Sequence, residues 1–69
     1  MNELVFEVTE DAHGGYSAEC LTEQIFTQAD DWVQLRAETR GAVAAFFFDG
    51  QVPQQIRLHL VRNEILSTA

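Results

Sequence analysis

The chain has 69 residues, 46% of them hydrophobic, and its eleven acidic side chains outnumber four basic ones to give a net charge of −7 at pH 7. This length predicts one small domain, residues 1–69, and this hydrophobic share predicts a folded core rather than disorder. The charge disfavours binding to nucleic acid or anionic lipid, and no apolar run reaches the roughly 20 residues of a membrane span. Acidic residues also stand near the N-terminus where a signal peptide needs bases, so we expect a cytoplasmic protein.

The first two predicted elements form a β-hairpin. Residues 3–10 and residues 16–20 both alternate between apolar and polar side chains, which is typical of half-buried strands. Between them, Gly14 and Gly15 are free to adopt the positive φ that a tight turn needs. A phosphate-binding loop would instead open a helix and usually carry a lysine, and this chain has no lysine. We therefore predict a structural turn.

A short strand over residues 24–28 and a helix over residues 31–48 follow. Asp31 with Gln34 fits a capping box at the start of the helix, and Gly50 is a natural stop at its end. One side of the helix carries residues suited to a core. They are Trp32, Leu35, Thr39, Ala42, Val43 and Phe46.

Residues 55–62 alternate again and predict a fourth strand. A three-strand meander followed by one helix and one strand predicts a parallel, right-handed crossover that returns the fourth strand beside the first. The predicted fold class is α+β, with two layers in the order β-β-β-α-β. The expected strand order across the sheet is third, second, first, fourth.

Two surfaces of this fold are candidates for contact with a partner. On the far side of the helix, where polar residues are expected, small and apolar residues cluster within about 80° of one another. They are Val33, Ala37, Gly41, Ala44 and Phe48. The second candidate is the sheet face without a helix, where Val5, Phe26 and Val61 lie among charged residues. Because a domain this small has a thin core, we expect a homodimer, with the helix side favoured slightly as its interface.

The candidates for catalysis are weaker. Cys20 is the only cysteine, and a thiol catalyst would need His13 or His59 beside it, with a third group to orient the imidazole. His13 and Cys20 lie at opposite ends of the second predicted strand, and nothing in the sequence fixes the third group. The histidines and acidic residues also lack metal-ligand spacing. We therefore expect a buried, inert thiol and a protein without catalytic residues, cofactor or metal.

Three segments, taken together in their order and spacing, resemble the HicB-like family. They are EDAHGGYSAEC, IFTQADDWVQLRAETRGAV and IRLHLVR. In that family an acidic strand ends in a Gly-Gly-Tyr hairpin turn, and a third strand leads into a helix capped by Asp or Thr. The matching residues here are Glu10, Asp11, Gly14, Gly15, Tyr16, Ala18, Thr27, Asp30, Leu35, Arg40 and Ala42. The chain departs from the family by having CLTEQIF where a Pro-Gly turn is common.

The resemblance implies a degenerate ribonuclease-H-like half and the function of an antitoxin that blocks a small basic mRNA-cleaving toxin. Family members usually add a DNA-binding segment after the fourth strand. Since the sequence ends there, we expect a short stand-alone member that does not bind an operator. We therefore expect a non-catalytic module that binds a small basic protein. The acidic charge of this chain would attract such a partner. The alternative is a small subunit that binds a metabolite or accompanies an enzyme.

Overall fold

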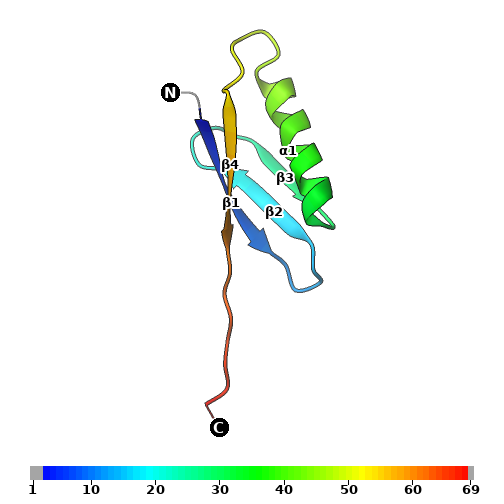
Figure 1. Ribbon diagram of the computed structural model, residues 1–69, viewed down its shortest axis with the longest axis vertical. Coiled ribbons are helices and arrows are strands. Elements are labelled where there is room, and N and C mark those ends of the chain that lie inside the picture. The colour runs from blue at the N-terminus through cyan, green and yellow to red at the C-terminus, as the bar shows by residue number, and fades with distance from the viewer. Residues whose placement is uncertain (1–2, 69) are drawn as a thin grey trace.

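The computed structural model describes residues 3–68. They form, in chain order, β1 (Glu3–Glu10), β2 (Tyr16–Cys20), β3 (Phe26–Ala29), α1 (Trp32–Phe46) and β4 (Gln55–Val61). The strands make one sheet in the order β3-β2-β1-β4, and α1 packs against one of its faces (Figure 1). β4 is parallel to β1, whereas the other neighbours are antiparallel, so α1 is part of the crossover. The α+β class and the strand order predicted from the sequence are confirmed.

The core lies between α1 and one face of the sheet. Leu4, Phe6 and Val8 of β1 point into it, as the alternation predicts, and meet the buried Leu35 and Val43 of the helix. α1 lies closest to β3 and β2. The strip of the same face along β4 is therefore less covered by the helix.

The start of the helix follows the predicted capping box. The Asp31 side chain accepts a 2.7 Å hydrogen bond from the backbone N–H of Gln34. In return, Oε1 of Gln34 accepts a 3.1 Å bond from the backbone N–H of Asp30. The first bond satisfies a donor that the first turn of a helix leaves without a backbone partner, and the second satisfies the N–H of the residue before the N-cap.

The predicted end of the helix is wrong. α1 stops at Phe46, with Phe47 as the capping residue, rather than continuing to residue 48. Gly50 does not adopt a positive φ and so does not act as the stop. Phe46 was expected to face the core but is 45% exposed, and Phe47 packs against the core instead. The physical reason lies at the cap: the backbone of Phe47, with φ −106° and ψ 32°, leaves the helical conformation, and the side chain that reaches the core at this end is that of Phe47.

Two smaller expectations also need correction. The third strand begins at Phe26 and ends at Ala29, two residues later at its start and one at its end than the predicted 24–28. In the hairpin turn only Gly14 has a positive φ, at 92°. Gly15 is required for lack of space instead, because a Cβ there would lie 2.8 Å from Oδ2 of Asp11 and 3.1 Å from the carbonyl oxygen of Ala29.

Within residues 3–68, no helix has the length and apolar character needed to cross a membrane.

Candidate functional site

The sheet face that points away from α1 carries a pair of adjacent carboxylates. Glu7 of β1 stands directly opposite Glu19 of β2, and both side chains are exposed. On its other side Glu7 stands opposite His59 of β4, and Glu19 stands opposite Phe26 of β3. One row across the sheet therefore places Glu7 and Glu19 at its centre. We call Glu7 and Glu19 the acidic pair.

No cation neutralises the acidic pair within residues 3–68. Arg57 instead pairs with Glu3, at 2.9 Å from Nη2 to Oε2, and Arg62 lies 3.6 Å from Glu10. Like charges that face each other across two strands destabilise the sheet. The acidic pair is thus an unfavourable arrangement in the free domain that a bound cation would relieve.

Apolar side chains surround the acidic pair. Phe26 is 60% exposed on β3, and Val5 and Val61 are half-buried on β1 and β4. Leu21, which is 61% exposed, joins them because it lines a surface hollow together with Glu19 and Phe26. Leu21 was not predicted as part of this face because it follows the strand predicted over residues 16–20 and falls in a predicted connection. Continuing the alternation from Glu19 through the buried Cys20 would have placed it on this face.

The small-residue side of the helix is exposed, as its pattern predicts for a surface. Val33 and Phe48 are 72% and 82% exposed, and a Cβ added to Gly41 would meet no atom within 4 Å. The five predicted residues nevertheless do not line one hollow. Ala37 and Gly41 line a depression beside β3, whereas Ala44 lines a different groove beside β4.

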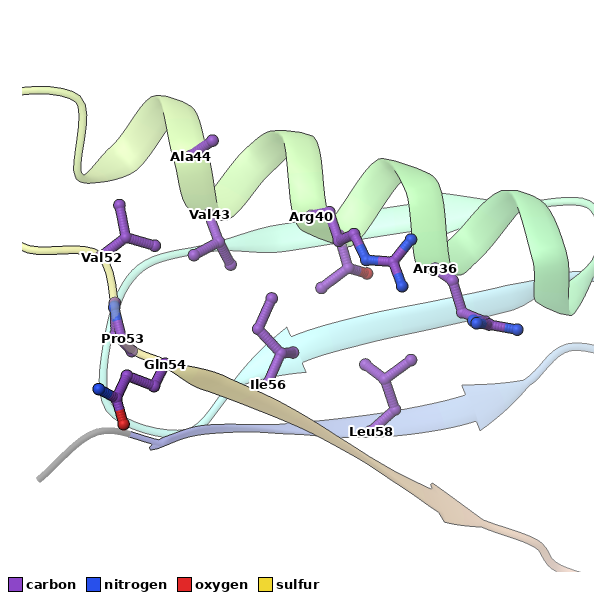
Figure 2. Close-up of a pocket in the computed structure, with 10 residues that line it drawn as sticks. Arg36, Arg40, Val43, Ala44, Val52, Pro53, Gln54, Ile56 and Leu58 are labelled. Atoms are coloured by element: carbon purple, nitrogen blue, oxygen red, sulfur yellow. The ribbon is translucent and has the colours of Figure 1, made fainter.

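The groove beside β4 was not predicted from the sequence. It has a volume of about 420 Å³ and lies between α1, the residues 52–54 that precede β4, and the start of β4. In Figure 2, Val43 and the side chains of Arg36 and Arg40 reach from the helix toward the sheet, and Ile56 and Leu58 point up from β4. Neither arginine has an ion pair among the described residues. No local pattern indicates this groove, because the groove depends on where the helix lies across the sheet.

The residues considered for catalysis lie apart. Cys20 is buried opposite Phe6 on the inner face, and its Sγ lies 3.8 Å from Oγ1 of Thr22. His59 stands opposite Glu7 on the outer face, so the sheet separates it from the thiol. His13 lies in the turn before β2. Residues 3–68 contain no group of three His, Cys, Asp or Glu side chains arranged to hold a metal ion.

The turn that holds His13 is organised by Asp11. Oδ1 of Asp11 accepts hydrogen bonds from the backbone N–H groups of His13, at 2.8 Å, and Gly15, at 2.9 Å. These bonds, the His13 bond foremost, lower the pKa of the Asp11 carboxyl below its ordinary value. The contacts are local to the turn, so the carboxylate of Asp11 has a structural role.

Comparison of the chain with protein-family models, with curated proteins and with solved structures found no match.

Proposed function

We propose that this protein is a non-catalytic, antitoxin-like module that binds a small basic protein on the outer face of its sheet. The observation that carries the proposal is the acidic pair. Glu7 and Glu19 are adjacent, exposed and without a cation among the described residues. A Lys or Arg of a partner placed between them would replace a repulsion with two attractions.

The surroundings of the acidic pair suit protein binding. An interface needs apolar area near its centre and polar groups that set orientation. Phe26 and Leu21 supply exposed apolar surface beside the carboxylates. The net charge of −7 would also accelerate the encounter with a basic protein by electrostatic steering.

The resemblance to HicB-like antitoxins suggests the class of partner, a small basic mRNA-cleaving toxin. Such an enzyme needs a positively charged surface to hold RNA phosphates. A carboxylate-bearing sheet that covers that surface would exclude RNA without any chemistry of its own.

The proposal is tested by purifying the tagged chain from its native host at moderate salt. We expect a small basic protein to remain bound, to cleave mRNA once separated, and to be inactive in the complex. The double variant Glu7→Lys/Glu19→Lys should lose this protein, because it places two cations against a cationic partner.

The matched control is Glu38→Lys/Asp49→Lys, which changes the net charge equally but leaves the acidic pair intact. This control should retain the partner. Equal loss from both double variants would show a general charge effect, and a wild-type chain that retains no basic protein would contradict the proposed function.

A further inference from the structure

β4 is an edge strand with an apolar inner side. The sheet order β3-β2-β1-β4 leaves one edge of this seven-residue strand without a neighbour among residues 3–68. On its inner side, Ile56 and Leu58 are half-buried and Leu60 is 39% exposed. A long, exposed edge strand offers unpaired N–H and C=O groups to a second chain.

The segment that follows β4 extends away from the domain. Figure 1 shows it running on from the end of the strand rather than folding back. Ile65 is 97% exposed and Leu66 is 74% exposed. Two adjacent aliphatic side chains this open to water indicate a segment whose contacts are made elsewhere.

We propose that two copies of this chain form a two-fold dimer by antiparallel pairing of β4 with β4. In this arrangement the segment after β4 of one copy runs back past the start of β4 of the other. It therefore reaches the loop that carries Val52 and Pro53, which line the groove beneath α1. Ile65 and Leu66 are then placed to cover the apolar side chains of that groove.

The charges of the groove and of the segment after β4 support this arrangement. Arg36 and Arg40 line the groove and have no ion pair among the described residues. Glu64, directly before the two exposed aliphatic residues, carries the opposite charge. A two-fold axis repeats each such contact, so both copies gain the same pairing.

The dimer differs from the helix-side dimer expected from the sequence, and it leaves the acidic pair free. Both helices lie on the same face of the joined sheet, and the outer faces of the two copies become continuous. This inference uses the inner side and edge of β4, so it stands or fails separately from the proposed function.

The test is sedimentation equilibrium of the full chain. We expect a dimer with a dissociation constant below about 50 µM. Leu60→Glu should raise this constant at least about tenfold by placing a carboxylate in the new apolar contact. Leu66→Glu should do the same, and its side chain is too exposed in the monomer for the change to disturb folding. The matched control Val33→Glu, on the solvent side of the helix, should dimerise like the wild type.

A charge-reversal cycle tests the position of the segment. Glu64→Arg and Arg40→Glu should each weaken the dimer about three- to tenfold, and the combined variant should recover most of the loss. A wild-type chain that stays monomeric at about 50 µM overturns the proposal. A dimer broken by Val33→Glu but not by Leu60→Glu or Leu66→Glu also overturns it and moves the interface to the helix.

Discussion

Thr27 and Thr39 place two hydroxyl groups inside an otherwise apolar core. Thr27 lies on β3 and Thr39 on α1; both are buried, and their Oγ1 atoms are 3.1 Å apart. Each hydroxyl gives the other a hydrogen-bond partner in place of the water that it loses on burial. The pair thus joins the helix to the edge strand β3 by a directional contact.

Replacing either threonine alone should cost stability, and replacing both should cost less than the sum of the two single losses. Thr39→Val keeps the shape but leaves the Thr27 hydroxyl without its partner, so we expect a loss of about 1–2 kcal/mol in the free energy of unfolding. The double variant Thr27→Val/Thr39→Val should lose less than the sum of the single losses. Urea denaturation of the four proteins measures this coupling, and strictly additive losses would show that the hydrogen bond contributes nothing.

Asp11 makes stability depend on pH. Its pKa is lowered in the folded chain because backbone N–H groups stabilise the carboxylate, so the folded state binds a proton less readily than the unfolded state. The contribution is present above the ordinary pKa of 3.8 and is lost as pH falls through the lower folded value. Asp11→Asn keeps an oxygen acceptor but cannot titrate.

We therefore expect Asp11→Asn to be less stable than the wild type at pH 7 and to lose less stability on acidification below about pH 4. Urea unfolding at neutral and acidic pH measures both effects. Parallel pH profiles for the two proteins would show that Asp11 does not contribute to the pH dependence of stability.

At the scale of elements, two glycines should respond in opposite directions to alanine. A Cβ at Gly41 meets open space in the middle of α1, so Gly41→Ala should stabilise the domain by about 0.5–1 kcal/mol. Gly15→Ala should destabilise it, because the new Cβ would crowd Asp11 and the backbone of Ala29. Thermal unfolding compares them, and a destabilised Gly41→Ala would mean that the helix surface is not free.

The Gly41→Ala variant also tests whether the solvent side of the helix is an interface. If a partner backbone approached α1 at Gly41, the added methyl group would weaken that association. The dimer proposed through β4 requires Gly41→Ala to associate like the wild type.

Local patterns predicted those parts of the fold that local physics determines. Strand alternation placed Phe6 inside, and the Asp31 capping box placed the start of the helix. The end of the helix was missed because it depends on how Phe47 packs against the core, which no local pattern encodes. The acidic pair was missed as a pair for a similar reason: Glu7 and Glu19 become neighbours only through the register of β1 and β2.

At the scale of the whole molecule, the two faces of the sheet have different roles. The inner face holds the core and, along β4, an apolar strip beneath Arg36 and Arg40. The outer face carries the acidic pair. In the proposed dimer the inner strip is covered by a second copy, while both acidic pairs remain open to a basic partner.

Carboxylate footprinting of the complex with the basic protein tests the central claim most directly. A carbodiimide and an amine label exposed carboxylates, and mass spectrometry locates each label. We predict that Glu7 and Glu19 react in the free protein and are protected in the complex, while Glu38 on the helix reacts equally in both. Protection of Glu38 with continued reaction of Glu7 and Glu19 would contradict the claim that the outer sheet face binds the partner.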